Sequence, residues 1–429
     1  MLQKIKNLSA LNLFKQSGIV FVLRMGGMFL SYVAILIISN YFGAEVYGRY
    51  SLSLVLLQFL VLIFSLGLTS STVKLTADIN FFQKKKPLNR YLLNSIILLI
   101  ASTIVCSLFV VVFKDKLAIY LFKDKKLIPY FNYISIFVVF AAFHAFIAEF
   151  IRARHKFVQY GIYLYVMPYV LLIAFLLLTK YLNYDESFTF LSYLLSLFVL
   201  SLIMLWYLPG KSLFTKNIYG YKALLSLSFP MMFSAAFIFI SNWTDIFMLG
   251  AMVSKSDVGI YNAAYKLAIL ALVVVNAVNT VLAPKISDFY SKNRLDKIET
   301  EVQKATKIIS IVTIPIVIIL ILFRKQLLGL FGPEFVQGQT ALVIISLGLL
   351  FNALSGSVGQ VLNMTKHQKQ LRLFTLISAL ANILLNFVLI KRMGITGAAI
   401  ASLMSNIVLN VLCIIYIKKK LGFYAFIKL

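Results

Sequence analysis

Residues 91–113 read YLLNSIILLIASTIVCSLFVVVF and contain no charged side chain. As a helix rising about 1.5 Å per residue, such a run is long enough to cross the roughly 30 Å hydrocarbon core of a bilayer. The composition extends this pattern to the whole chain, because 61% of the 429 residues are hydrophobic and 13% are charged. Soluble domains have about 25% charged residues. The sequence therefore predicts a protein that crosses the membrane many times.

Charge-free windows locate the predicted spans, because backbone in lipid must satisfy its hydrogen bonds within a helix or a closed barrel. Twelve windows meet this condition: 25–44, 50–73, 91–113, 127–148, 157–179, 187–210, 223–244, 267–284, 308–323, 335–365, 373–390 and 393–417. Window 308–323 is short and needs flanking side chains that reach the interfaces, whereas window 335–365 should contain a turn. We expect an all-α polytopic membrane protein of twelve transmembrane helices.

The charge distribution predicts the orientation. The chain has 41 Lys and Arg against 14 Asp and Glu, a formal net charge of +27. The basic residues form small clusters between apolar runs, which is typical of membrane loops and excludes a nucleic-acid partner. Most of them lie inside if both termini are cytoplasmic, although loop 114–126 carries five lysines outside. The basic start lacks a cleavage site before Arg24 and is read as a retained cytoplasmic tail.

The predicted loops favour a transporter over an enzyme. The longest polar segment, 285–307, is expected to be a cytoplasmic surface helix joining spans eight and nine. No loop offers the ordered extramembrane segment that a membrane polymerase or ligase needs to hold acid and base groups on its substrate. Cys106 and Cys413 lie in apolar runs without CxxC or histidine neighbours, so neither a metal, a disulfide nor a cofactor is predicted.

An internal repeat organises the chain. Gly48-Arg49-Tyr50 recurs as Gly259-Ile260-Tyr261, 211 residues later, and 114–122 resembles 324–332 at a similar offset. His155 and His367 align in the same way. We therefore predict two six-helix bundles, residues 1–210 and 211–429, with the same membrane orientation.

Four motifs carry a resemblance to a known family: NYFGAEVYGRYSL (40–52), DVGIYNAAYKL (257–267), LFGPEF (330–335) and GITGAAIASLMSN (394–406). In this order, they resemble the polysaccharide-export branch of the MOP superfamily, which includes Wzx-type O-antigen flippases and is related to the MATE drug exporters. The resemblance implies two bundles in a V around a lumen. It also implies that undecaprenyl-diphosphate-linked oligosaccharide crosses from the inner to the outer leaflet of the bacterial plasma membrane by alternating access.

The implied partners are the lipid-linked oligosaccharide, membrane lipids, and the polymerase and chain-length machinery of a surface polysaccharide such as O-antigen. Two alternatives remain. One is a MATE-like exporter of small molecules coupled to a cation, although an organic-cation lumen should favour carboxylates and only Asp245 and Glu149 lie near the membrane interior. The other is a membrane polysaccharide polymerase or ligase, which the short outer loops disfavour.

Three charged residues directly beside charge-free windows are expected to lie within the membrane and are candidate functional groups, because an intramembrane charge costs about 2.5–3.5 kcal/mol even on insertion scales. Arg24 could hold a diphosphate through its bidentate guanidinium, or it could simply snorkel to headgroups. Asp245 and Lys266 lie at comparable depth, so they form either a structural ion pair or functional sites. Asp245 is the candidate for the coupling ion, a proton or sodium, and Lys266 for the lumen.

The remaining candidates are polar or basic residues that a purely structural role would explain equally well. Asn242, Trp243 and Asn276 give sugar-compatible surfaces in spans seven and eight, although helix–helix hydrogen bonds explain the two asparagines as well. Arg152, Arg154 and His155 lie at the cytoplasmic end of span four. They could receive a diphosphate entering from inside, although the positive-inside rule alone predicts the two arginines.

Overall fold

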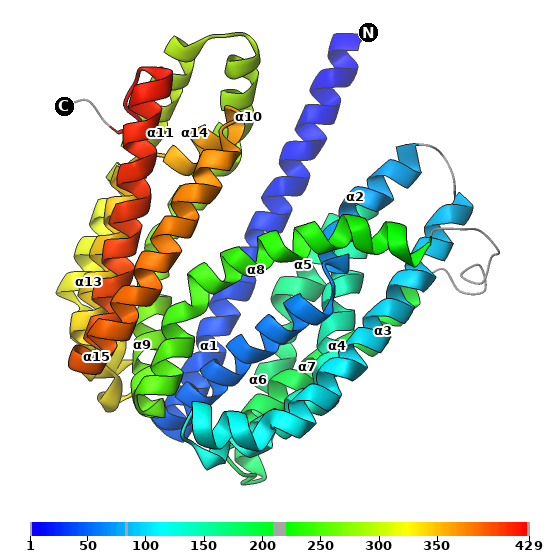
Figure 1. The fold of residues 1–429 in the computed structure, drawn as a ribbon, viewed down its shortest axis with the longest axis vertical. Helices are drawn as coiled ribbons and strands as arrows, with labels where there is room; N and C mark the ends of the chain where they lie inside the picture. The colour runs from blue at the N-terminus through cyan, green and yellow to red at the C-terminus, as the bar shows by residue number, and fades with distance from the viewer. Residues whose placement is uncertain (1, 82–84, 209–219, 427–429) are drawn as a thin grey trace. The chain divides into compact units, whose positions relative to one another are not determined.

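The structure is a computed structural model that describes residues 2–81, 85–208 and 220–426, which are helical with no β-strand in these ranges (Figure 1). The chain forms two compact units. The N-terminal unit comprises Met1–Phe42 and Leu52–Phe239, and the C-terminal unit comprises Gly43–Ser51 and Ile240–Leu429. The predicted boundary between 210 and 211 falls in 209–219, outside the described residues, so the two repeat halves stay a prediction.

The N-terminal unit holds six whole α-helices, α1 without its residues Gly43–Ser51, and the first part of α8, among its described residues. These are α1 (Leu2–Phe64), α2 (Leu68–Phe81), α3 (Lys85–Lys116), α4 (Ile128–Ala153), α5 (Phe157–Gly161), α6 (Met167–Tyr181), α7 (Phe188–Met204) and α8 (Tyr221–Met252). Short π or 3-10 turns are η1 (Leu117–Leu121), η2 (Lys125–Leu127), η3 (Ile162–Val166) and η4 (Leu205–Tyr207). The core lies where α4 packs against α3 and α7, and it buries Leu99, Phe146, Ile151 and Leu200.

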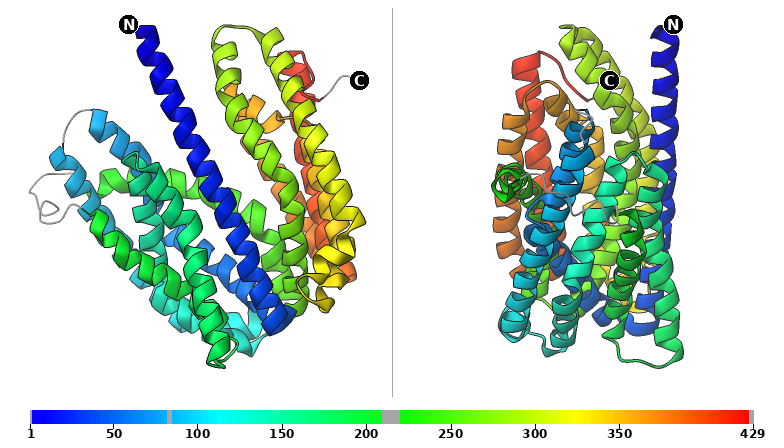
Figure 2. Two further views of the ribbon diagram at one scale, coloured as in Figure 1. Left: turned by 180° about the vertical axis from the view of Figure 1, so that it is seen from behind. Right: turned by 90° about the vertical axis from the view of Figure 1, so that its right-hand side faces the viewer.

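The C-terminal unit contains the end of α8 and the remaining helices. They are α9 (Lys255–Ala268), η6 (Ile269–Ala271), α10 (Leu272–Ser291), α11 (Leu295–Leu322), α12 (Arg324–Gly329), η7 (Pro333–Gly338), α13 (Gln339–Leu354), α14 (Val358–Met364) and α15 (Gln368–Leu421). One core cluster buries Ile286, Val302, Val361 and Cys413 between α10, α11, α14 and α15. The yellow-green hairpin of α10 and α11 is clear in Figure 2.

Ten described segments are long and apolar enough to cross a membrane, whereas the sequence predicted twelve windows. Two of the ten, Gly18–Phe64 and Gln368–Leu421, have 47 and 54 residues, and each overlaps two predicted windows. A glycine interrupts each of them: Gly43 has φ 82° and Gly394 has φ 55°. These left-handed conformations favour glycine because it has no Cβ.

Two expectations about the C-terminal unit are corrected. The segment 285–307 is not a separate surface helix, because α10 continues to Ser291 and α11 begins at Leu295. An ion pair between Lys285 and Glu301, 2.8 Å long, ties the two helices together there. Window 308–323 is consequently part of a 28-residue helix. The turn expected within 335–365 lies between α13 and α14, where Gly356 has φ 83°.

Candidate functional site

Asp245 is a buried carboxylate in the C-terminal unit. It lies on α8, in a segment long and apolar enough to span a membrane, and its exposed fraction is 8%. Charged groups at such positions are rare in membrane helices and generally face partners or an aqueous cavity. The groups that contact this side chain therefore decide what it can do.

Three uncharged donors hold the Asp245 carboxylate. The Tyr261 hydroxyl on α9 donates to Oδ2 over 2.7 Å, and the Ser402 hydroxyl on α15 donates to the same oxygen. The Asn386 amide, also on α15, donates to Oδ1 over 2.7 Å. Hydroxyl and amide donors thus hold Asp245. Whether Asp245 and Lys266 also act as an ion pair stays a prediction.

Further polar groups on α15 extend this arrangement. The Asn386 amide also donates to Asn382 Oδ1 over 3.0 Å, and the Asn382 amide donates to the Ser405 hydroxyl over 3.4 Å. We call Asp245, Tyr261, Asn382, Asn386, Ser402 and Ser405 the Asp245 cluster. Asn386 Oδ1 is buried and accepts no hydrogen bond from the described residues. The cluster therefore combines a carboxylate with a neighbouring free carbonyl oxygen, which suits a proton or a hard cation.

The backbone of α15 explains how these groups meet. The helix breaks at Gly394, so the part carrying Asn386 and the part carrying Ser402 belong to two helical segments of one chain. Their approach needs Gly397, because a Cβ at that position would lie 2.3 Å from the Leu389 carbonyl oxygen. Asn382 and Asn386 are four residues apart and so share one helix face.

Three of the four other predicted C-terminal residues lie on helices of the cluster, α8 and α9, and the fourth lies on α10. Asn242 is exposed and Trp243 half-buried on α8; Lys266 is half-buried in the last turn of α9; and Asn276 is exposed on α10. Asn276 uses its backbone carbonyl to accept a hydrogen bond from the Thr280 hydroxyl. That Asn242, Trp243, Lys266 and Asn276 bind substrate stays a prediction.

Arg24 and Arg152 lie over two neighbouring tyrosine rings of the N-terminal unit, Tyr165 and Tyr160, whose centres are 5.9 Å apart. Arg24 is exposed on α1, with its guanidinium carbon 6.0 Å from the centre of the Tyr165 ring. Arg152 lies near the end of α4, 2.5 Å from the Glu149 carboxylate and over the Tyr160 ring. Arg154 and His155 are exposed just beyond that helix, where His155 adopts a left-handed φ of 58°.

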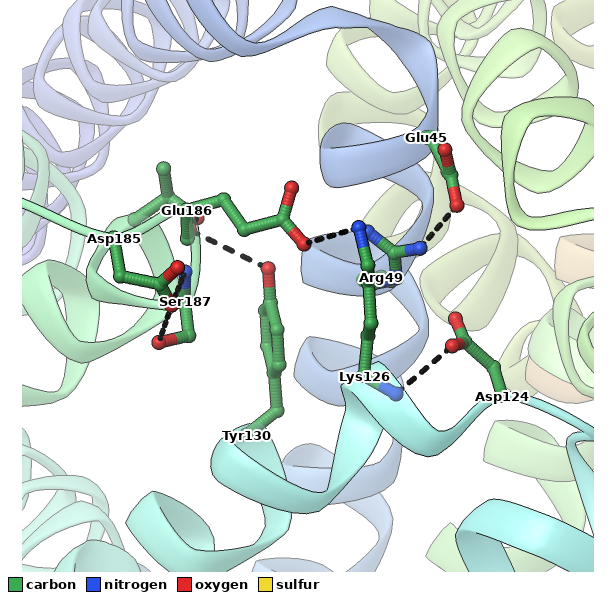
Figure 3. A network of polar contacts seen from close by, with 9 residues as sticks. Glu45, Arg49, Asp124, Lys126, Tyr130, Asp185, Glu186 and Ser187 are labelled. Atoms are coloured by element: carbon green, nitrogen blue, oxygen red, sulfur yellow. Dashed lines mark hydrogen bonds and ion pairs between the residues drawn. The ribbon is translucent and has the colours of Figure 1, made fainter.

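A polar junction joins the starts of α4 and α7 in the N-terminal unit (Figure 3). Lys126 Nζ lies 3.5 Å from the Glu186 carboxylate. The Tyr130 hydroxyl donates a hydrogen bond to the backbone carbonyl of Glu186. The Ser187 hydroxyl donates to Asp185 over 2.7 Å, and this bond lowers the pKa of Asp185. In the C-terminal unit, the same figure shows Arg49 paired with Glu45 four residues earlier.

Sequence reasoning singled out Asp245 but missed Tyr261, Asn386 and Ser402 as its partners. A signal was present, because Asn382 and Asn386 place two amides on one face of an otherwise apolar window. Ser402 lies in the motif GITGAAIASLMSN (394–406), which contributed only to the family resemblance. The break at Gly394 brings these groups to Asp245, and residue spacing alone does not reveal that geometry.

Solved structures share the fold. An inward-facing MATE multidrug resistance transporter of the MOP superfamily aligns with a TM-score of 0.79 at 15% identity, covering 94% of this chain and 98% of that one. The lipid II flippase MurJ, in an inward closed conformation, aligns with a TM-score of 0.74 at 18% identity, covering 94% of this chain and 87% of that one.

Curated relatives match over shorter stretches. The protein named "Probable low-salt glycan biosynthesis flippase Agl15" of Haloferax volcanii is 27% identical over 172 residues, 40% of this chain and 36% of that protein. The capsular polysaccharide biosynthesis protein CapF of Staphylococcus aureus is 24% identical over 217 residues, 49% of this chain and 55% of that protein. The matched stretches thus span between about a third and about half of these relatives.

Two family models match the sequence. The MatE model matches residues 230–388, which include Asp245 and Asn386. The model described as "Polysaccharide biosynthesis protein" matches residues 13–290, well over half of the chain. The chain therefore belongs to the polysaccharide biosynthesis protein family.

Proposed function

We propose that this protein is a flippase that moves a lipid-linked oligosaccharide from the inner to the outer leaflet of the plasma membrane by alternating access. The observation that carries this proposal is the family match over residues 13–290. The fold shared with the lipid II flippase MurJ supports it, as do relatives named for glycan flipping and capsular polysaccharide biosynthesis. The expected substrate is an undecaprenyl-diphosphate-linked repeat unit, and the protein is expected to act as a transporter without catalysing a reaction.

The proposed topology has twelve spans, with both termini in the bacterial cytoplasm. Ten segments qualify by length, and the kinks at Gly43 and Gly394 divide two of them. A straight helix of 54 residues would be about 80 Å long, far more than a bilayer core of about 30 Å, so we count each kinked segment as two spans. An even number places both termini on one side, and the basic loops select the cytoplasm.

The substrate is anionic at its diphosphate and rich in hydroxyls at its glycan. We assign Arg24 and Lys266 to the diphosphate, because a guanidinium or ammonium pairs with phosphate oxygens. Asn242, Trp243 and Asn276 are assigned to the glycan. Arg152, Arg154 and His155 are assigned to the cytoplasmic entrance, where the two arginines are only partly buried or exposed. Polymerase and chain-length proteins are the expected partners after flipping.

The Asp245 cluster is the proposed coupling site, which binds a proton or sodium in one conformation and releases it in the other. Asn386 Oδ1, which accepts no hydrogen bond from the described residues, gives an added cation a second oxygen beside the carboxylate. Asp245→Asn tests this assignment. The Asn386 and Asn382 amides can each turn over, so that Asn386 Oδ1 accepts from the new amide. The variant should therefore fold but lose its dependence on the ion gradient.

A second candidate is a MATE-like exporter of small molecules coupled to a cation. It is favoured by the MatE match across residues 230–388, which contains the proposed coupling residue. Such an exporter should leave lipid-linked glycans unchanged when deleted and should raise sensitivity to organic cations. A membrane polymerase or ligase would instead join lipid-linked units when purified protein is added to them.

Deletion followed by extraction of polyprenyl-diphosphate glycans distinguishes these functions. The flippase proposal expects one complete repeat unit to accumulate on the cytoplasmic leaflet while surface polymer falls, and a plasmid copy should reverse both effects. Accumulation of flipped but unjoined units on the outer leaflet would point to a polymerase. Unchanged lipid-linked glycans would refute the proposal.

A further inference from the structure

The loop 114–126, between α3 and α4, carries the largest group of basic residues on the side of the membrane opposite the predicted cytoplasmic loops. It holds five lysines and two aspartates. The other outer loops of the proposed topology carry one or two basic residues each. Translocated loops of membrane proteins generally contain few Lys and Arg residues, so this group calls for an explanation beyond topology.

The loop is folded against α4. The Phe122 side chain is buried, and its ring centre lies 6.1 Å from that of Phe131 on α4. The Asp124 N–H donates to the Ala118 carbonyl oxygen over 2.8 Å. The Asp124 carboxylate in turn accepts from the backbone N–H of Lys126 over 3.0 Å (Figure 3). These contacts fix the backbone that carries the lysines.

Three of the five lysines are exposed and have no carboxylate partner. They are Lys116, Lys123 and Lys125. Within the described ranges, none of the three forms an ion pair with an Asp or Glu side chain. The other two lysines have partners, because Lys114 Nζ donates to Asn132 Oδ1 over 2.8 Å and Lys126 Nζ lies near Glu186. Three ammonium groups thus remain to meet an anion outside the chain.

Exposed apolar side chains lie beside these ammonium groups. They are Phe113, Ile119, Tyr120 and Leu121, of which Tyr120 is 78% exposed. Lys116 Nζ lies 5.8 Å from the centre of the Phe113 ring. Aromatic rings favour the headgroup level of a bilayer, and lysine stems cover apolar surface while the charge reaches the polar side. This combination fits a lipid partner better than a soluble anion.

The position of the loop agrees with such a partner. The segments on either side, Tyr91–Leu121 and Lys125–Ala153, are each long and apolar enough to cross a membrane. The loop therefore lies where two spans end, at the boundary between hydrocarbon and headgroups.

We propose that Lys116, Lys123 and Lys125 bind the phosphate groups of anionic phospholipids, with Tyr120 and its apolar neighbours inserted in the interface. An ammonium attracts phosphate as a compact point charge, and anionic headgroups attract basic clusters next to a span. The assignment of these lipids to the outer leaflet rests on the topology given under the proposed function. Binding itself requires neither the glycan nor the Asp245 cluster.

Tryptophan quenching in lipid nanodiscs tests the proposal. Since the sequence has two tryptophans, Tyr120→Trp combined with Trp206→Phe and Trp243→Phe leaves a single one, in the loop. All discs contain phosphatidylcholine and phosphatidylglycerol at one fixed ratio, and equal amounts of either lipid carry bromine, which quenches tryptophan on contact. Quenching by brominated phosphatidylglycerol should exceed that by brominated phosphatidylcholine roughly twofold or more. The excess should shrink between about 0.05 and 0.5 M salt, because salt screens exposed charges.

Two sets of substitutions in this reporter protein assign the preference to the loop. The first set replaces the exposed loop lysines: Lys116→Gln, Lys123→Gln and Lys125→Gln. It should make quenching by the two lipids equal. The matched control removes the same charge from exposed positions of the C-terminal unit: Lys297→Gln, Lys366→Gln and Lys369→Gln. It should leave the preference unchanged. Equal quenching by both lipids in the unsubstituted reporter, or a preference that survives the loop substitutions, would overturn the proposal.

Inorganic pyrophosphate distinguishes lipid phosphate from a diphosphate as the anion. If pyrophosphate changed the emission of the loop tryptophan while neither lipid was preferred, the lysines would bind a diphosphate and the lipid proposal would be wrong. The discs contain no glycan and expose both faces of the membrane. A failed lipid preference therefore leaves the flippase proposal intact, and a protein that does not flip can still show the preference.

Discussion

Ser402→Ala should cost more folding free energy than Ser378→Ala, although both remove one hydroxyl from α15. Ser402 donates to the carboxylate of Asp245, whereas Ser378 donates to the neutral backbone carbonyl of Ser405 over 2.7 Å. The two substitutions share residue type and helix. Their difference therefore isolates the effect of the charge on the acceptor.

The expected magnitudes follow from the two acceptors. Hydrogen bonds to charged groups contribute about 1.5–3 kcal/mol, and loss of Ser402 leaves Asp245 with Tyr261 and Asn386 as donors. Neutral hydrogen bonds between membrane helices contribute about 0.6 kcal/mol on average, which is the expected cost of Ser378→Ala. The difference of about 0.9–2.4 kcal/mol corresponds to a roughly 5- to 60-fold change in the unfolding equilibrium.

Reversible unfolding of the purified protein in lipid–detergent mixtures at pH 7 provides the assay. The two variants should differ in their free energy of unfolding, because a carboxylate is a stronger hydrogen-bond acceptor than a neutral backbone carbonyl. Equal costs at pH 7 would refute an ionised Asp245 held by Ser402. In that case the cluster would be a neutral hydrogen-bonded network and could not hold a cation through its charge.

Three further predictions address other parts of the chain. Gly48→Ala and Gly259→Ala should each reduce folded yield strongly. A Cβ at Gly48 would lie 1.7 Å from the Lys255 carbonyl oxygen, and one at Gly259 would lie 2.2 Å from the Ala44 carbonyl oxygen. In a thermal-unfolding assay the control is Gly26→Ala, because a Cβ there would have nothing within 4 Å. Arg24→Ala should lower surface polysaccharide at unchanged protein level and Arg24→Lys should restore it partly, because an ammonium lacks the bidentate fork; full polymer in Arg24→Ala returns Arg24 to a snorkelling role. Since the Ser187 hydrogen bonds lower the pKa of Asp185, their stabilisation is present above the unfolded pKa of about 4 and is lost as pH falls below it. Asp185→Asn should thus speed hydrogen exchange in the first turn of α7 at pH 7, relative to the wild type, and by a smaller factor at acidic pH. A ratio of variant to wild-type exchange rates that does not change with pH would contradict this prediction.

The sequence predicted the fold class well because membrane spans are set by composition. Runs without charge had to become helices, and the structure places helices over every window within its described residues. The sequence predicted the ends of the helices less well. The polar segment 285–307 continues α10 and α11 since ion pairs such as Lys285–Glu301 stabilise a polar hairpin, and hydropathy does not register that contribution.

The candidate site was predictable only where a single residue was anomalous. Asp245 stands out because a carboxylate is expensive in a membrane helix. Asn386 and Ser402 are individually ordinary in such helices, where polar side chains commonly bond neighbouring helices. Their role depends on α15 breaking at Gly394, and the backbone conformation that brings residues 386 and 402 to α8 has no signature in residue spacing.

The predicted internal repeat can be compared with the contacts of the residues that it aligns. Gly48 and Gly259, which align at the repeat offset of 211, pack against each other: a Cβ on either would meet the backbone of the residue four before the other, Lys255 or Ala44. Ser51 and Asn262 align at the same offset and are hydrogen-bonded over 2.7 Å. Such reciprocal pairing is what a local two-fold axis produces, and all these residues lie in the C-terminal unit.

Gly48 and Gly259 must both be glycine, because the lack of a Cβ on each lets the backbone of the other segment approach. A position needed for the duplicated architecture should therefore be matched in both halves, as Gly48 and Gly259 are. Asp245 is not matched, since it aligns with Ala34 at the repeat offset. The residues that align with Asn386 near the same offset, 174–176, are all apolar. If the two halves are repeats as predicted, their shared architecture does not require the Asp245 cluster. A buried carboxylate retained in only one half, at the cost of desolvation, is better explained by a function of that half, and ion coupling is the function its oxygen-rich surroundings suit.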